Sequence, residues 1–239
     1  MRHCDVTPPT PEENLACDEA LLDVCEAGAT DEVLRLWQPV RHFVVVGYSN
    51  SVETEVNVAF CQRQGIPILR RCTGGGTVLQ GPGCLNYSLV LRIEGTNALH
   101  SVATTNEFIL QRHATALSAL LGAPVERKGQ TDLAIRDLKF SGNAQRRKKR
   151  CLLFHGSFLV DFDLELLAKA LPMPSRQPDY RLGRSHGDFL TNLKVSVQRV
   201  KAALRECWNA NEALTQAPLP KIQALVREKY GRDEWNMRL

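Results

Sequence analysis

The residues with the clearest capacity for chemistry form one short stretch, 70–78, in which two arginines lead into three consecutive glycines. Glycines have no Cβ, so their backbone N–H groups can approach a ligand closely. Adjacent guanidinium groups supply fixed positive charge for a carboxylate or a phosphate. The combination favours a pocket for an acidic, phosphorylated small molecule over a flexible hairpin. The residues predicted to form it are Arg70, Gly74, Gly75, Gly76, Thr77 and Val78.

A second motif lies directly downstream, where a turn at 81–83 leads into an alternating strand. Residues two apart on a strand share a face, so Asn86 and Ser88 can both point into the pocket that the glycines begin. Their alternative role is to place polar groups on the outer side of a half-buried strand.

The third motif begins at Lys139, which precedes a predicted turn of small residues and then a strand with a His-Gly pair. This lysine can neutralise an anion in the same pocket, although a single lysine in a sequence is more often a surface residue. The basic run 146–150 has no interleaved aromatic residues, so it favours a solvated loop over a nucleic-acid site. The candidate site residue of this segment is Lys139.

Apolar periodicity predicts the elements that must position these motifs. Strands are expected over 33–37, 43–47, 66–71, 77–79, 86–92, 125–126, 132–135, 138–140 and 151–160. Helices are expected over 12–26, 103–121, 164–170, 195–209 and 220–230, with Gly122 ending the second and a proline-rich loop at 172–178. The fold class is therefore α+β, with an open mixed or antiparallel sheet, helices on one face and the pocket near the other.

Length and composition narrow the class of protein. The 239 residues suit one domain, 1–239, and the net charge of +4 is too small to argue for nucleic acid. No apolar run is long enough to span a membrane, and no signal-peptide pattern opens the sequence. The eight cysteines show no spacing typical of metal ligands, so they indicate reduced thiols in a cytoplasmic protein.

Together the motifs resemble those of the lipoate–protein ligase A-like family, which belongs to the biotin and lipoate ligase superfamily. The shared features are the Arg-Arg-x-x-Gly-Gly-Gly-x-Val segment, the Asn-Tyr-Ser strand, the Lys-x-Ser-Gly-x-Ala-Gln turn and the His-Gly strand, in this order. Segments 14–22, 34–37, 44–50 and 230–236 also resemble family elements. The resemblance covers nearly the whole chain and implies a two-layer catalytic domain, here without the C-terminal accessory domain that many members carry.

The resemblance also implies a reaction in two steps. Lipoate and ATP, with Mg²⁺, give lipoyl-adenylate and pyrophosphate. A lysine of a lipoyl-domain acceptor protein then forms an amide and releases AMP. The acceptors implied are the glycine cleavage H protein or the E2 component of 2-oxoacid dehydrogenases, and a separate accessory chain can take part. No nucleic-acid or membrane partner is expected.

In this reading Lys139 is the catalytic residue, because a fixed cation stabilises charge that develops at phosphorus. Arg70 adds charge, and Asp132 either holds Mg²⁺ or orients Lys139. The residues expected to bind ATP and lipoyl-adenylate are Arg70, Gly74, Gly75, Gly76, Thr77, Val78, Asn86, Asp132, Lys139, Ser141, Gly142, Ala144, His155 and Gly156. The apolar residues expected to line an acyl tunnel, or to form plain core instead, are Val78, Leu79, Leu89 and Phe158.

Two other activities stay open. One is a cysteine acyltransferase on the same scaffold, which moves octanoate from acyl carrier protein through a thioester. The family positions of its nucleophile correspond to 127–132 and 171–174, which contain no cysteine, and Cys151 matches neither. The pattern therefore favours the ligase. The other is a non-catalytic lipoyl-binding relative, which Gln80 and Asn143 favour because the family often has histidine and serine there.

Overall fold

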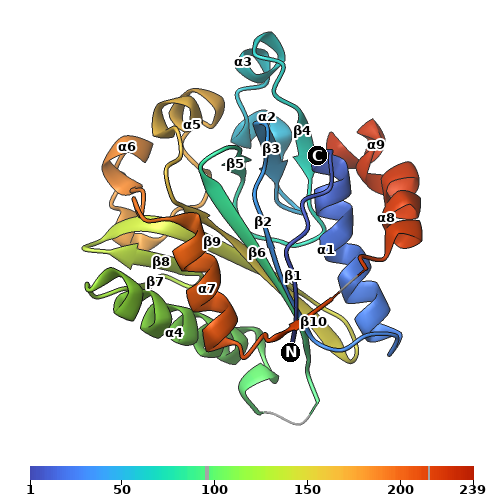
Figure 1. The fold of residues 1–239 in the computed structure, drawn as a ribbon. Helices are drawn as coiled ribbons and strands as arrows, with labels where there is room; N and C mark the ends of the chain where they lie inside the picture. Colours follow the sequence, from blue (N-terminus) through green and yellow to red (C-terminus); the bar gives the residue numbers. More distant parts are fainter. Residues whose placement is uncertain (95–96, 215) are drawn as a thin grey trace.

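The computed structural model describes residues 1–94, 97–214 and 216–239. Eight strands form its central sheet: β1 (Arg2–Cys4), β2 (Val33–Trp37), β6 (Cys84–Arg92), β7 (Glu126–Lys128), β8 (Asp132–Ile135), β9 (Leu138–Arg147), β10 (Cys151–Leu159) and β11 (Glu212–Ala213). Their order is β11-β1-β2-β6-β10-β9-β8-β7 (Figure 1). β11, β1 and β2 are parallel, and the pairs from β2 to β7 are antiparallel. The prediction of a mixed sheet is confirmed.

A second, three-stranded sheet carries the glycine-rich segment. It consists of β3 (Phe43–Val46), β4 (Ile68–Arg70) and β5 (Val78–Gln80). β3 lies in the middle, parallel to β4 and antiparallel to β5. The chain between β4 and β5 therefore has to cross from one edge of this sheet to the other. We call this crossing, residues 71–77, the glycine loop.

Helices and single turns fill the connections. The helices are α1 (Pro11–Glu26), α2 (Val52–Glu55), α3 (Val58–Arg63), α4 (Val102–Leu121), α5 (Leu164–Ala170), α6 (His186–Phe189), α7 (Val197–Cys207), α8 (Leu219–Leu225) and α9 (Asp233–Asn236). Short turns are η1 (Asn97–Leu99), η2 (Asp179–Arg181) and the π-turn η3 (Val226–Tyr230). α1 begins with a capping box between Thr10 and Glu13, and α4 ends at Gly122 with φ 62°, as the sequence predicts.

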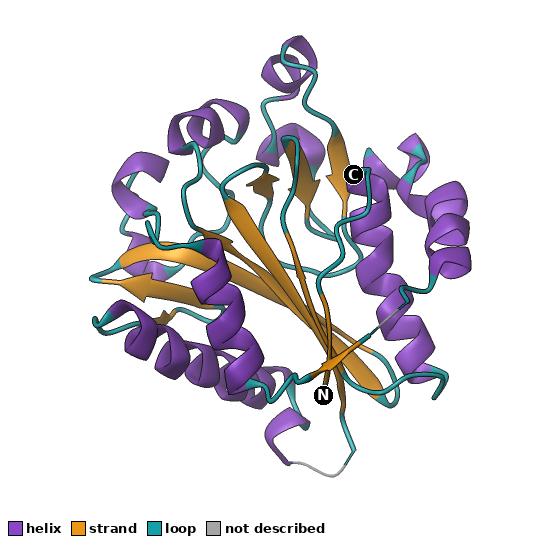
Figure 2. Ribbon diagram, in the orientation of Figure 1, coloured by secondary structure: helices purple, strands orange, loops and turns teal. Residues whose placement is uncertain are grey.

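Helices pack on both faces of the central sheet (Figure 2). Alternation along β6 directs Tyr87 and Leu89 toward α4 and α7, whereas Val90 joins the core beneath α1. A third apolar cluster joins the small sheet to α5. The prediction of helices on one face alone is wrong, because α1 and α8 lie on the other face (Figure 1).

The segment after Lys139 differs most from its prediction. It is not a turn: β9 continues to Arg147 and pairs with β10 along its length. The run 146–150 is likewise not a free loop, since Arg147 donates to the carbonyls of Leu99 and His100. These small and polar residues show no apolar alternation, and pairing with β10 from Ser141 to Arg147 makes them a strand.

The short elements β1, α2, α3, α6 and β11 were not expected, and most other predicted bounds agree within two residues. Within the described residues, no helix is both long and apolar enough to cross a membrane.

Candidate active site

A cavity of about 870 Å³ opens beside the glycine loop. The loop and β5 form one wall, β6, β9 and β10 form the floor, and the segment 171–190 forms the opposite wall. The predicted site residues that line it are Gly75, Gly76, Thr77, Val78, Asn86, Asp132, Lys139, Ser141, Gly142, Ala144, His155 and Gly156. Three segments far apart in the sequence are thus brought to one place.

Arg70 does not line the cavity, and its predicted place there is wrong. Its side chain is fully buried, and every hydrogen bond that it donates goes to a backbone carbonyl. Nη1 lies 2.9 Å from the Gly47 oxygen and 2.7 Å from that of Asn50, and Nε lies 3.2 Å from that of Trp235. Arg70 therefore ties the C-terminal segment to the loop after β3. Gly74 also lies outside the lining.

Arg71 occupies the position that we expected for Arg70. Its Nη2 donates to the carbonyls of Gly74 at 2.6 Å and Gly76 at 2.7 Å, so the glycine loop wraps around the guanidinium group. Only 7% of Arg71 is exposed, and it forms no ion pair with any residue that the structure describes. Burial lowers the pKa of Arg71 to about 10, which keeps it charged at neutral pH.

The glycine at the tip of the loop is required by geometry. Gly75 has φ +85°, a conformation that side chains disfavour. A Cβ there would lie 3.0 Å from Arg71 Nη2 and 3.4 Å from the Ala144 Cβ. Gly75 thus lets the loop close over Arg71 and against β9.

Lys139 reaches the cavity from β9 and is held by a carboxylate. Its Nζ lies 2.8 Å from Asp132 Oδ1, and the Tyr180 hydroxyl donates to the other oxygen, Oδ2, at 2.9 Å. Gly142 leaves room for the lysine, because a Cβ there would lie 3.1 Å from Nζ. Burial, and then the Asp132 charge, raise the pKa of Tyr180 above its ordinary value, so the phenol stays a donor.

These contacts distinguish between the two roles considered for Asp132, which are to hold Mg²⁺ or to orient Lys139. Both carboxylate oxygens already have partners, and no cluster of three or more His, Cys, Asp or Glu residues suited to a metal occurs in the described residues. The donor set therefore does not fit a dedicated Mg²⁺ site. It fits the alternative, in which Asp132 orients Lys139.

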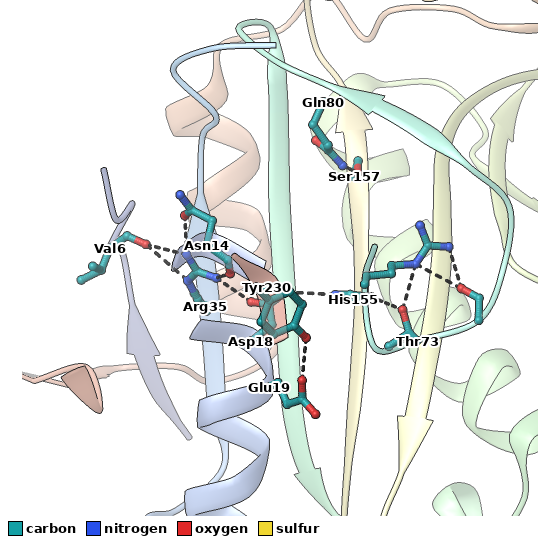
Figure 3. Close-up of polar contacts among 12 residues, drawn as sticks. Val6, Asn14, Asp18, Glu19, Arg35, Thr73, Gln80, His155, Ser157 and Tyr230 are labelled. Atoms are coloured by element: carbon teal, nitrogen blue, oxygen red, sulfur yellow. Dashed lines mark hydrogen bonds and ion pairs between the residues drawn. The ribbon is translucent and has the colours of Figure 1, made fainter. Parts of the chain in front are cut away.

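His155 links α1 to the glycine loop (Figure 3). Its Nδ1 lies 2.9 Å from Asp18 Oδ2, and its Nε2 lies 2.7 Å from Thr73 Oγ1. Asp18 Oδ1 in turn accepts from Arg35 Nη1 at 2.6 Å. When Nδ1–H donates to the carboxylate, Nε2 can accept a hydrogen bond from the Thr73 hydroxyl. We call Arg35, Asp18, His155 and Thr73 the relay; of these the sequence indicated only His155.

The electrostatics of the relay favour a charged carboxylate. Burial alone would raise the pKa of Asp18, but the Arg35 guanidinium and the hydrogen bond from His155 outweigh it. The pKa of Asp18 therefore lies below its ordinary value of 3.8. A charged Asp18 fixes the orientation of the imidazole.

Apolar residues and one free amide complete the lining. Leu15, Trp37, Val45, Val78 and Leu79 contribute apolar surface. Leu89 and Phe158, for which the sequence left both an acyl tunnel and plain core open, pack in the core with α4. Asn86 is only 2% exposed, and neither of its amide atoms has a partner among the described residues. A buried amide of this kind is normally satisfied by water or a ligand.

The thiols lie elsewhere. None of the eight cysteines lines the cavity. The Cys151 Sγ lies 3.0 Å from the Cys25 Sγ, at the far end of β10. Burial raises the pKa of Cys72 to about 11 and that of Cys84 to about 12. Both thiols are thus protonated at neutral pH and are poor nucleophiles.

The chain is similar to known proteins over nearly its whole length. The model of the lipoyl protein ligase A/B catalytic domain family matches residues 10–208. The bipartite lipoate protein ligase of Thermoplasma acidophilum, studied with its E2 lipoyl domain, superposes with a TM-score of 0.83 at 25% identity, over 99% of this chain and 95% of that one. A lipoate-protein ligase A bound with ATP gives 0.81 at 26%, over 99% and 98%. The octanoyltransferase LipM of Geobacillus kaustophilus is 28% identical over 95% of this chain and 94% of its own.

Proposed function

Since the chain belongs to the lipoyl protein ligase A/B catalytic domain family, we propose that it is a lipoate–protein ligase that activates lipoate with ATP. Its relatives are named lipoate ligases and octanoyltransferases, which supports attachment of a lipoyl or octanoyl group to a protein. Of these two reactions, we propose ATP-dependent ligation.

One observation carries that choice, namely the lining of the cavity. Arg71 and Lys139 bring cationic groups to it, whereas all eight cysteines lie outside it. A thioester intermediate needs a thiolate that touches the acyl donor. Adenylation instead needs cations and N–H donors around phosphate.

The first step joins two anions. An oxygen of the lipoate carboxylate attacks the α-phosphorus of ATP, and the bond from that phosphorus to the departing pyrophosphate breaks. Lys139, oriented by Asp132 at 2.8 Å, stabilises the charge on the phosphoryl oxygens. The glycine loop lies against the acyl and phosphate groups, and Leu79 and Trp37 are placed to contact the acyl chain.

The second step forms the amide. The amine of an acceptor lysine attacks the acyl carbonyl of lipoyl-adenylate, and AMP leaves. We propose that the acceptor is a lipoyl domain of the glycine cleavage H type or of the 2-oxoacid dehydrogenase E2 type. The E2 lipoyl domain studied with the Thermoplasma ligase supports this. Because that ligase is bipartite, we also propose that residues 1–239 form the catalytic domain and that a separate chain supplies the accessory part.

The test is a lipoylation assay read by intact mass. The protein is incubated with lipoate, ATP, Mg²⁺ and a lipoyl domain, and the acceptor is expected to gain one lipoyl group only when ATP is present. If the acceptor gains no lipoyl group, neither with the protein alone nor with an accessory chain added, the proposal is contradicted.

The octanoyltransferase is tested in the same assay with octanoyl-acyl carrier protein in place of lipoate and ATP. Its support is the likeness to LipM. An acyl adduct on a cysteine that passes to the lipoyl domain without ATP would favour this alternative. Cys151→Ser is expected to keep ATP-dependent lipoylation, because the Cys151 thiol contacts Cys25 rather than the cavity.

A further inference from the structure

A second buried guanidinium group faces the cavity from the wall opposite the glycine loop. Arg181, at the end of η2, lines the cavity but is only 4% exposed. It forms no ion pair with a carboxylate anywhere in the residues that the structure describes. A buried cation without a countercharge is unfavourable unless an anion joins it.

The contacts of Arg181 hold it in place without neutralising it. Nε donates to the Arg184 carbonyl at 3.0 Å, and Nη2 lies 3.3 Å from Met173 Sδ and 3.5 Å from His186 Nδ1. The guanidinium carbon lies 4.7 Å from the centre of the Phe189 ring. His186 donates from Nε2 to the Pro172 carbonyl at 3.0 Å, which leaves Nδ1 as an acceptor for Arg181.

Two connections place Arg181 at the same end of the cavity as Lys139. The residue before it, Tyr180, donates to Asp132, the carboxylate that holds Lys139. The segment after it returns to β9, where the Thr191 N–H donates to the Lys139 carbonyl at 2.9 Å. An anion that extends from Lys139 toward the 171–190 wall therefore meets Arg181.

We propose that Arg181 binds the β- and γ-phosphates of ATP and stabilises the pyrophosphate that leaves. The proposal rests on the proposed function and states which group of the substrates each part of the site binds. The lipoate carboxylate and the α-phosphate meet near Lys139, and adenine carries no charge. Arg71 is enclosed by the glycine loop, whereas Arg181 follows Tyr180, which contacts the carboxylate that holds Lys139, so we assign the β- and γ-phosphates to Arg181.

The bonds of the step balance with this assignment. One oxygen–phosphorus bond forms between lipoate and the α-phosphate, and the bond between the α-phosphorus and the oxygen bridging it to the β-phosphorus breaks. The electron pair stays on that oxygen, so negative charge develops on pyrophosphate. A guanidinium group can donate two hydrogen bonds to phosphate oxygens at once.

Pyrophosphate binding gives a test that does not need turnover. Calorimetry should show that the full chain binds inorganic pyrophosphate and that Arg181→Gln weakens this binding by about tenfold or more. Arg181→Lys, which keeps the charge, should recover part of the affinity. Arg199→Gln is the control, because it removes the same charge from an exposed side chain that donates to the Leu120 carbonyl and lies outside the cavity.

The two half-reactions give a second readout. Arg181→Gln should raise the KM for ATP in adenylation by about tenfold or more and leave lipoyl transfer from supplied lipoyl-adenylate at the wild-type rate, since pyrophosphate takes no part in transfer. Equal losses in both half-reactions, or an equal loss of pyrophosphate affinity in Arg199→Gln, would overturn the proposal. So would unchanged pyrophosphate binding by Arg181→Gln. A different outcome would overturn the proposed function: pyrophosphate binding depends on Arg181, but the wild-type protein does not carry out ATP-dependent lipoylation.

Discussion

At the scale of single residues, the site is shaped by which charges are neutralised and which are not. Lys139 is paired with Asp132, so its position is fixed. Arg71 and Arg181 have only neutral partners in the described part of the chain, so their charge is left for a ligand. One oriented cation together with two unpaired ones in the same cavity suits a substrate with several negative groups.

Removal of the Lys139 ammonium should abolish adenylation. For Lys139→Ala, loss of this charge-assisted contact is expected to cost about 3 kcal/mol or more of transition-state stabilisation, measured as the rate of pyrophosphate release. Lys128→Ala is the control, since that lysine is also ion-paired, with Glu126 and Asp137, but lies outside the cavity. Near-normal pyrophosphate release by Lys139→Ala would contradict the catalytic role assigned to Lys139.

A side chain at Gly75 should weaken lipoate binding. Gly75→Val combines backbone strain at φ +85° with a Cβ 3.0 Å from Arg71 Nη2. Gly65→Val is a matched control: it has φ +62° but no heavy atom within 4 Å of the added Cβ. Both variants should lose about 1 to 2 kcal/mol of stability through strain, and only Gly75→Val should lose lipoate affinity by calorimetry. Equal affinities would mean that the loop is only a turn.

Arg70 and Arg71 show which part of the site the sequence could not predict. The motif correctly indicated a guanidinium group beside the glycines, because that combination suits an anion. It did not tell Arg70 from Arg71, since neighbouring residues at the end of a strand point to opposite sides. The choice depends on Asn50 and Trp235, whose carbonyls accept from Arg70 and which are remote from it in the sequence.

At the scale of elements, the relay joins α1, β2, β10 and the glycine loop. Arg35 comes from β2, Asp18 from α1 and His155 from β10. Thr73 ends the relay and also accepts from Arg71 Nε at 2.9 Å. The loop that closes the cavity is therefore held by elements from the interior of the fold.

The relay predicts a pH dependence of stability. Because the folded pKa of Asp18 lies below 3.8, its ionised form stabilises the fold above that pH, and the contribution is lost as pH falls through the folded pKa. Asp18→Asn leaves Arg35 buried without its partner, which should cost about 3 to 5 kcal/mol at neutral pH.

Urea unfolding between pH 7 and 3 measures the effect. The difference in unfolding free energy between wild type and Asp18→Asn should be constant near neutrality and shrink below pH 3.8. Asp31→Asn removes exposed ion pairs with Arg2 and Arg92 and should cost no more than about 1 kcal/mol. A difference for Asp18→Asn that grows in acid would contradict the role given to this carboxylate.

Elements with clear apolar spacing followed from the sequence, and elements without it did not. The strand over 33–37 and the helix over 164–170 have the predicted bounds, because apolar spacing is clear there. α2 and α6, each four residues long, carry too few apolar residues for a helical pattern. α6 and η2 lie in the wall that carries Arg181 and Tyr180, so this part of the site was missed with them.

At the scale of the whole molecule, the C-terminal segment supports the wall that carries the glycine loop. The Trp235 indole donates to the Arg70 carbonyl at 2.9 Å, and the Asn236 side chain accepts from the Arg70 N–H at 3.0 Å. Asn50, whose carbonyl Arg70 holds, donates to the Gly75 carbonyl at 3.2 Å. Contacts therefore run continuously from α9 to the tip of the loop.

Truncation after residue 232 should disturb stability and binding together. The truncated chain loses the acceptors for a buried guanidinium group, so the melting temperature and the lipoate affinity are both expected to fall. Glu234→Ala is the control, because this exposed side chain forms an ion pair with the exposed Arg232 and not with Arg70. A lower melting temperature with unchanged lipoate affinity would show that the segment does not support the loop.

The distance between Arg70 and Trp235 along the chain also has a consequence for the timing of synthesis. The two are 165 residues apart, so the ribosome adds the residues that hold Arg70 roughly 10 to 30 s after Arg70 itself. Until then the guanidinium group lacks part of its set of acceptors, and the glycine loop has an incomplete frame. A nascent chain should therefore form its central sheet first and become able to retain lipoate only when translation of this segment is finished.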